Sequence, residues 1–358
     1  MIYEIMHREN CVAQISTVGE CKIYLEDFMP YDLMLEESND FDKRIKNAMS
    51  FYSWCASRMI PPDRTYAKEI LNSIGAPQSV TDRERAQIAL SYHCLSLLDV
   101  FWVKEENEKV RFEDINLFAH SLSNALVDIA LRGHQMTVTN AHLLANDLST
   151  GGLYPKAWVR KEDGFYLYKD GGRDAVEREV LASKICRCFD CHQVLYEQGM
   201  FENEPVSISK IMTSQRYSLV TYAAYDVYCT NHDWNTLDKI LELDAPGYYM
   251  MNILDYLVGN TDRHWENWGL LVDNETNQPI RLHDLMDFNR AFQQYDTPEG
   301  ANCLTVGKRH LSQKDAAVEA VRNIGLNQVR QVEHAVFSGH PAWKATFEER
   351  LRVLRNAM

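Results

Sequence analysis

The spacing of apolar residues along the chain predicts a protein of mixed α and β structure. Short or alternating apolar runs are typical of strands, which we expect at residues 13–16, 21–24, 157–159, 165–169, 268–272 and 280–282. Apolar residues at helical spacing predict helices near 43–59, 83–98, 117–131, 174–188 and 343–354, with further helical spacing between 318 and 332. The strands at 268–272 and 280–282 flank a polar turn, so we expect them to form a hairpin.

Polar residues with a chemically informative spacing stand just before this hairpin. Residues 259–269, GNTDRHWENWG, contain Asp262 and Asn267, which match the Asp-x-x-x-x-Asn spacing of a phosphoryl-transfer loop. In such a loop the aspartate orients a hydroxyl nucleophile and the asparagine binds Mg²⁺. Asn, Thr and Asp also favour turns and caps, so a plain turn after a helix is the alternative interpretation.

The hairpin returns the chain to a second acid. Asp287 opens Asp-Phe-Asn, a sequence close to the Asp-Phe-Gly segment whose aspartate binds Mg²⁺ in protein kinases. Asp284 is a rival three residues earlier, but Asp287 has the Phe. One carboxylate and one amide, completed by phosphates and water, suit Mg²⁺. We therefore expect Asn267 and Asp287 to be the metal ligands.

A glycine pair and a strand lysine lie upstream of the acids. The segment STGGLYPK contains Ser149, Thr150, Gly151, Gly152 and Lys156, and Lys169 ends the second strand that follows it. Glycines let backbone N–H groups approach phosphate oxygens, and a lysine on that strand would meet the α- and β-phosphates of ATP. Each signal alone is weak, because a Gly-Gly pair is more often a turn and a strand lysine is more often solvated. Their order before Asp262 favours a nucleotide site.

The helix expected at 174–188 carries two candidate partners for Lys169. Glu177 and Glu179 are two positions apart, which is about 200° around a helix, so only one of them can face the lysine. We choose Glu179 and keep Glu177 as the alternative. A solvated helix glutamate is the commoner role for either acid.

In this order the motifs resemble the HipA-like family of bacterial serine/threonine kinases. The resemblance covers residues 140–295 and is carried by STGGLYPKAWV, EREVLASKIC and GNTDRHWENWG. It implies an α+β, two-lobed protein-kinase-like fold with ATP and Mg²⁺ between the lobes. It also implies a protein substrate and an antitoxin-like partner.

Roles follow from the resemblance by position. It implies that Asp262 is the catalytic aspartate, that Asn267 and Asp287 hold the metal, and that Lys169 contacts ATP. Ser149 falls where the family's founding toxin carries an autophosphorylated serine, so Ser149 is a candidate for the same modification.

Residues 209–212 resemble the hinge strand that meets adenine, which makes Lys210 and Met212 candidate nucleotide contacts. His264 is expected to brace the catalytic loop through hydrogen bonds rather than to act as a base.

Several departures from the better-known kinase pattern narrow the interpretation. No Gly-x-Gly-x-x-Gly precedes the lysine, Asn289 replaces the glycine of Asp-Phe-Gly, and no Ala-Pro-Glu segment follows. These differences argue against a eukaryotic-type protein kinase. The Asp-Arg-His-x-x-Asn order also resembles phosphoinositide kinases, so a lipid or small-molecule kinase is one alternative. A catalytically inactive kinase-fold binding module is another.

Composition sets broader limits. The chain of 358 residues is 46% hydrophobic and 25% charged, which is typical of a soluble globular protein with more than one core. Its 37 basic and 51 acidic residues give a net charge of −14, which argues against direct nucleic-acid binding. We see neither a signal peptide nor a membrane-spanning run and expect a cytoplasmic protein. Nine cysteines without a regular framework suit a reducing compartment.

One cysteine-rich cluster is a candidate zinc site. It consists of Cys186, Cys188, Cys191 and His192. Structural zinc sites normally draw ligand pairs from two separated segments, and no second segment is apparent. We therefore expect buried cysteines on the helix that carries Glu179.

The predicted elements suggest three parts. Residues 1–139 form a small mixed accessory domain, residues 140–213 a kinase N-lobe, and residues 214–358 a mainly helical C-lobe.

Overall fold

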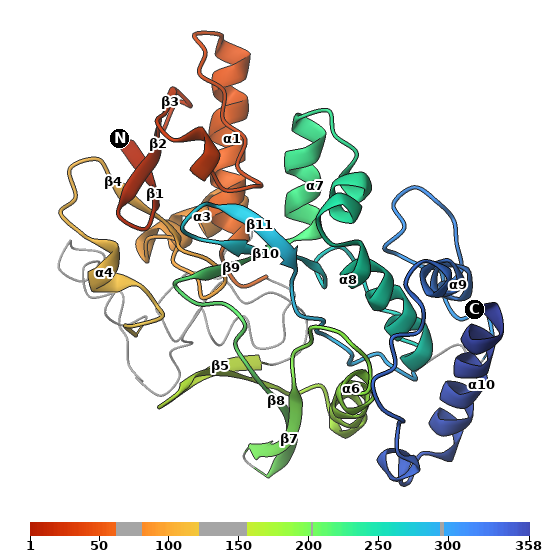
Figure 1. Cartoon of the computed structure of the whole chain (residues 1–358). Helices are drawn as coiled ribbons and strands as arrows, with labels where there is room; N and C mark the ends of the chain where they lie inside the picture. The colour runs from red at the N-terminus through yellow and green to blue at the C-terminus, as the bar shows by residue number, and fades with distance from the viewer. Residues whose placement is uncertain (62–80, 122–155, 202, 294–296) are drawn as a thin grey trace. The chain divides into compact units, whose positions relative to one another are not determined.

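A computed structural model describes residues 1–61, 81–121, 156–201, 203–293 and 297–358 (Figure 1). Contacts between residues divide the chain into two compact units. The first consists of Met1–Asp163, Thr213–Ser218 and Asp273–Gln278, and the second of Gly164–Met212, Leu219–Val272 and Pro279–Met358. The expected boundary at residue 139 lies outside the described residues. From residue 164 onward, most residues of the expected N-lobe and of the expected C-lobe belong to the second unit.

The first unit is built on a four-stranded antiparallel sheet in the order β3-β2-β1-β4. Its strands are β1 (Ile2–His7), β2 (Asn10–Ser16), β3 (Cys21–Ile23) and β4 (Phe101–Glu105). The other elements are η1 (Glu26–Phe28), α1 (Phe41–Ser57), α3 (Asp82–Ser91), α4 (Phe112–Ile115) and β5 (Lys156–Lys161). Strands were expected at β2, β3 and β5, whereas β1 was not foreseen.

Two of the helix predictions for this unit are wrong in part. The helix predicted at 83–98 ends at Ser91, because His93 and Cys94 adopt left-handed backbone angles (φ of 61° and 55°) that end the helix. Residues 117–121, the described part of the helix expected at 117–131, form turns and bends. The helix predicted at 43–59 is confirmed as α1, which begins after Asp40 because its carboxylate accepts the Lys43 N–H.

The second unit contains the elements that carry the predicted chemistry. Strand β6 (Gly164–Lys169) pairs antiparallel with β8 (Glu204–Lys210), and β8 pairs antiparallel with β7 (Tyr196–Phe201), so that the strand order within this unit is β6-β8-β7. Helix α6 (Arg173–Cys186) follows β6. Strands β9 (Tyr217–Thr221), β10 (Gly269–Asp273) and β11 (Gln278–Leu282) form a second sheet in the order β11-β10-β9. The hairpin expected at 268–282 is therefore confirmed.

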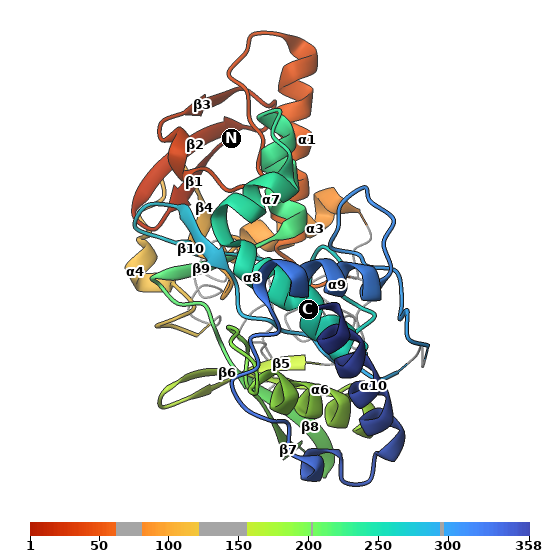
Figure 2. The ribbon, with the colours of Figure 1, turned by 45° about the vertical axis from the view of Figure 1, so that its right-hand side comes forward.

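Helices α7 (Tyr222–Asn231), α9 (Gln313–Ile324) and α10 (Pro341–Ala357) of this unit pack against α8 (Thr236–Val258), and the short helix η2 (His334–Phe337) precedes α10. Both α9 and α10 lie against α8 (Figure 2). The C-terminal half of α8 is buried on all sides, which is typical of a central core helix. No described helix is long and apolar enough to cross a membrane.

Helix α8 is two helical segments joined at Asp244. This residue has non-helical backbone angles (φ −153°, ψ 64°) and precedes Pro246, which suits the first turn of a helix. The Asp244 carboxylate caps the second segment by accepting the Gly247 N–H at 2.9 Å, and it also accepts the Leu282 N–H of β11 at 3.0 Å. One side chain thus starts the central helix and attaches it to the hairpin.

Gly269, the first residue of β10, has no room for a side chain. A Cβ there would lie 2.1 Å from the Val220 carbonyl oxygen and 2.7 Å from the Thr221 backbone. We expect Gly269→Ala to lower the free energy of unfolding by about 3 kcal/mol, because backbone rather than a side chain must move. Thermal unfolding measures the loss.

A matched control is Gly199→Ala on the outer strand β7. The added Cβ at this position meets the Ile208 side chain, which can change rotamer, so we expect a much smaller loss. Equal destabilisation by the two substitutions would contradict this account.

Candidate active site

Lys169 lies at the end of β6 between two carboxylates. Its Nζ atom is 3.0 Å from Glu179 Oε1 on α6 and 2.5 Å from Asp287 Oδ1. The lysine is 6% exposed and the glutamate 1%. Ser207, opposite Lys169 on β8, donates its hydroxyl to Glu179 Oε2 at 2.5 Å. A strand, a helix and the segment after the hairpin therefore meet at one buried ammonium group.

The ammonium group of Lys169 stays charged in this setting. Burial lowers the pKa of the lysine, but the charges of Asp287 and Glu179 more than offset that effect, and the pKa rises above its ordinary value. A permanent positive charge at this point is what binding of phosphate oxygens requires.

Asp287 is held in an uncommon backbone conformation. Its φ is 58°, in the left-handed region that non-glycine residues rarely occupy. The Asp287 N–H donates to the Tyr196 hydroxyl at 3.2 Å, and Tyr196 is buried. Such angles persist only where surrounding contacts impose them, and they are concentrated at functional sites. Here the conformation accompanies the contact of the carboxylate with Lys169.

The segment of residues 259–268, which contains Asp262 and Asn267, begins where α8 ends. Gly259 ends the helix in the left-handed conformation (φ 61°). Asn260 is fully buried; its side-chain N–H group donates to Asp255 Oδ1 at 3.0 Å, and its Oδ1 accepts the Asp262 N–H at 3.3 Å. Asn267 donates its side-chain N–H to the Asp262 carbonyl at 2.8 Å. That bond fixes the amide orientation and leaves Oδ1 as the acceptor atom of the Asn267 side chain.

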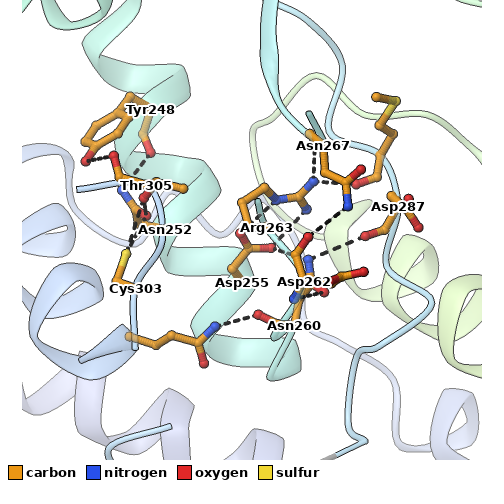
Figure 3. A network of polar contacts seen from close by, with 12 residues as sticks. Tyr248, Asn252, Asp255, Asn260, Asp262, Arg263, Asn267, Asp287, Cys303 and Thr305 are labelled. Carbon is orange, nitrogen blue, oxygen red and sulfur yellow. Dashed lines mark hydrogen bonds and ion pairs between the residues drawn. The ribbon is translucent and has the colours of Figure 1, made fainter. Parts of the chain in front are cut away.

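A buried ion pair holds this loop against the Asp287 segment (Figure 3). Arg263 is 3% exposed and contacts both oxygens of Asp255 on α8, at 2.9 and 3.0 Å. The same guanidinium donates to the Asn267 carbonyl at 2.8 Å and to the Met286 carbonyl at 2.5 Å. Arg263 therefore joins the central helix, the loop and the residue before Asp287.

Asp262 is partly exposed, as is Asp287, whereas Glu179 is buried. The Asp262 carboxylate is 3.5 Å from the Arg290 guanidinium, which is 43% exposed. Burial raises the pKa of Asp262 above its ordinary value; Arg290 and His264 act against the rise, Asp287 adds to it, and Lys169 opposes it. These influences place Asp262 within electrostatic reach of both Asp287 and Lys169.

Glu177 and Asp284, the alternatives to Glu179 and Asp287, contact residues other than Lys169. Glu177 Oε2 is 3.4 Å from His340 Nε2, on the side of α6 away from Lys169. Asp284 is paired with Arg281 at 2.8 Å. His264 is exposed, and its Nδ1 accepts the Glu266 N–H at 3.2 Å, a bond within the loop.

The other residues predicted to contact the nucleotide do not gather around Lys169, or they lie outside the described residues. Met212 packs against the cluster of Val176, Val180, Val194 and Tyr196 on the α6 side of the site. Lys210 is exposed, with its Nζ 5.8 Å from the centre of the Tyr166 ring. Lys156 begins β5 in the first unit. Ser149, Thr150, Gly151 and Gly152 lie outside the described residues.

The cysteine cluster does not form a metal site in the described part of the chain. Cys186 and Cys188 are buried and Cys191 is half-buried. Burial raises the pKa of the Cys191 thiol to about 12, so this thiol is protonated near neutral pH. No group of three or more His, Cys, Asp or Glu side chains among the described residues is placed to hold a metal ion.

Sequence reasoning missed Asp255, Arg263, Asn260 and Tyr196. A signal existed for the first of them, because Asp255 interrupts the apolar run MMNILDYLV and a lone acid on a buried helix needs a partner. Nothing in the local sequence identifies that partner as Arg263 or ties Tyr196 to Asp287.

Comparisons with known proteins identify the fold. No protein-family model and no curated protein sequence matches the chain. The HipA structure from the Shewanella oneidensis MR-1 toxin–antitoxin complex with HipB and operator DNA is 10% identical, with a TM-score of 0.50, and the match covers 99% of this chain and 89% of that one. The Helicobacter pylori proinflammatory kinase CtkA is 15% identical, with a TM-score of 0.47 over 58% of this chain and 92% of that one. The chain has the mixed α/β fold of HipA, as the motifs implied.

The Asp255–Arg263 pair gives a stability prediction. Asp255→Asn keeps the side-chain shape but leaves a buried guanidinium without its counter-charge, so we expect a loss of about 3–5 kcal/mol in the free energy of unfolding. Urea denaturation measures it.

The control removes a carboxylate from an exposed pair. Glu242 contacts Lys239 at 2.7 Å with the glutamate 65% exposed, and Glu242→Gln should change stability by less than about 0.5 kcal/mol. A loss for Asp255→Asn as small as that of the control would mean that Arg263 is stabilised by other contacts.

Proposed function

We propose that this chain is an ATP- and Mg²⁺-dependent kinase of the HipA-like type that transfers the γ-phosphate of ATP to a serine or threonine of a protein. The observation that carries the proposal is the buried contact of Lys169 with both Glu179 and Asp287. It joins residues that are 118 positions apart, in the order that the sequence motifs require. The fold that the chain shares with HipA has a place for each of these motifs.

The oxygen donors at the site fit Mg²⁺. Asp287 would supply a carboxylate and Asn267 an amide oxygen; the orientation of that amide is fixed because its N–H group donates to the Asp262 carbonyl. Two protein oxygens completed by phosphate and water are the usual magnesium environment beside a nucleotide. When bound, the ion would neutralise charge on the β- and γ-phosphates. Lys169, already fixed by Glu179, would donate to the phosphates next to it.

Asp262 would orient the acceptor hydroxyl and accept its proton. Its carboxylate is partly exposed, as contact with an incoming substrate requires. Burial raises the pKa of Asp262, which makes the ionised carboxylate a stronger base than an ordinary aspartate. Arg290, beside it, is placed to offset negative charge that gathers there during transfer.

The nature of the acceptor and partner is part of the proposal. A protein serine or threonine follows from the HipA-like motifs, and we include Ser149 of the chain itself as an acceptor. The HipA structure is a complex with HipB and operator DNA, so we propose an antitoxin-like protein partner. The same comparison gives no support to the expectation that nucleic acid is not bound.

The role of Asp262 is tested by a single substitution. Asp262→Asn should reduce phosphate transfer from labelled ATP by at least roughly a hundredfold and leave Mg-ATP affinity largely unchanged, because the acid acts on the acceptor rather than on the nucleotide. Transfer is measured to the chain itself, with Ser149→Ala as a second variant, and to proteins of a cell lysate.

Glu266→Gln is the matched control, since it removes one negative charge from an exposed position of the same loop and should preserve transfer. Transfer found only in a lipid or metabolite extract would favour a small-molecule kinase. Tight Mg-ATP binding without any transfer would favour an inactive binding module.

The metal role of Asp287 is tested by comparing it with Asp284. We expect Asp287→Asn to weaken ATP binding roughly tenfold or more in the presence of Mg²⁺, because a direct metal ligand is lost. Asp284→Asn breaks the pair with Arg281, and the variant should bind ATP as tightly as the unmodified chain does.

Calorimetry with and without EDTA completes the test. The deficit of Asp287→Asn should disappear when the metal is removed. If the loss of ATP affinity in Asp287→Asn were equally large in EDTA, Asp287 would support ATP binding only through Lys169 and would not be a metal ligand.

A further inference from the structure

Three consecutive side chains of α6 contact three different parts of the second unit. Glu179 binds Lys169 at 3.0 Å, and Arg178 donates through Nε to the Asn289 carbonyl at 2.8 Å. Glu177 lies 3.4 Å from His340, directly before α10. Successive residues of a helix point about 100° apart, so α6 is held from opposite sides. Only the first of these contacts belongs to the nucleotide site.

His340 belongs to an aromatic stack that reaches the segment after Asp287. The His340 ring lies parallel to the Trp343 ring at a centroid distance of 3.8 Å, and Trp343 stacks on Phe292 at 5.5 Å. Phe292 also meets Phe337 of η2 edge-on at 6.5 Å. Its φ is 55° and its N–H donates to the Val258 carbonyl of α8 at 2.8 Å. The segment after Asp287 is therefore fixed between the central helix and the chain's C-terminal part.

The same C-terminal part contacts the other end of α6. Phe189, just beyond the helix, forms an antiparallel bridge with Gln328. The Val329 N–H donates to the Cys188 carbonyl and the Asp190 N–H to the Asn327 carbonyl, both at 2.9 Å. Residues 327–343, which we call the C-terminal clamp, thus contact the chain at the end of α6 and the helix itself at Glu177.

We propose that the C-terminal clamp sets the position of α6 and, through it, assembles the Lys169–Glu179 pair and the Asp287–Phe292 segment. Glu177, His340 and Trp343 are positioning residues, since none of them contacts Lys169, Asp262 or Asp287 in the described structure. The partly exposed Glu177–His340 pair contributes little by itself. The aromatic stack contributes more, because each such pair is worth about 0.5–1.5 kcal/mol beyond its buried area. Only the effect of the clamp on catalysis rests on the proposed kinase function.

Hydrogen exchange of the full-length protein tests the clamp without reference to activity. In Trp343→Ala, amides of residues 173–186 and 287–293 should exchange roughly two- to tenfold faster, the range that an aromatic pair represents. Trp343→Phe retains a ring and should restore most of the protection. Glu177→Gln, which cannot disturb the core, should accelerate exchange in α6 alone and by less.

The matched control is Arg352→Ala, an exposed position on the same helix α10, which should leave both regions unchanged. Mg-ATP affinity measured on the same proteins should weaken in Trp343→Ala and recover in Trp343→Phe. Exchange in α6 that is unaltered in both Trp343→Ala and Glu177→Gln would overturn the clamp. Altered exchange in a chain that binds no Mg-ATP would support the clamp and contradict the proposed kinase function.

Discussion

The buried ammonium group of Lys169 is the interaction on which the candidate site depends. Two carboxylates contact it: Glu179 from the helix that follows β6, and Asp287 from a segment 118 residues beyond Lys169 in the chain. Removing a charge from water is costly unless it is paired, so the lysine, Glu179 and Asp287 hold one another in place. Counting also Asp262 and Arg290, the site contains three acids and two bases. Such a group has a net negative charge, which suits a divalent cation, and in the proposed function the anionic nucleotide would bind together with that cation.

The second constraint is the support behind the acids. Arg263, paired with Asp255, fixes the carbonyl groups of Asn267 and Met286, and Asn260 fixes the Asp262 N–H. Both Arg263 and Asn260 are themselves bonded to Asp255, near the buried end of α8. Asp262 and Asp287 can therefore stay close to each other despite their like charges, because the framework and not the carboxylates sets their separation. This rigidity is what electrostatic preorganisation for phosphoryl transfer requires.

Much of this arrangement was predictable from short-range patterns. The strand ending at Lys169, the helix carrying Glu179 and the hairpin before Asp287 follow from apolar spacing and turn residues, and each is present. The helix predicted at 83–98 failed because the left-handed angles of His93 and Cys94 have no local signature in the sequence. The central helix α8 was not foreseen. Contacts such as Arg263 with Met286 or Trp343 with Phe292 depend on the completed fold, so periodicity could not predict them.

The most direct test is a crystal structure of the full chain with a nonhydrolysable ATP analogue and Mn²⁺, located by its anomalous scattering. We expect the ion within about 2.2 Å of Asn267 Oδ1 and an Asp287 carboxylate oxygen, as for Mg²⁺ in octahedral oxygen coordination. A phosphate oxygen should lie within hydrogen-bonding distance of Lys169 Nζ, with the Lys169–Glu179 contact retained. A nucleotide bound away from Lys169, or a metal ion bound to neither Asn267 nor Asp287, would contradict the account.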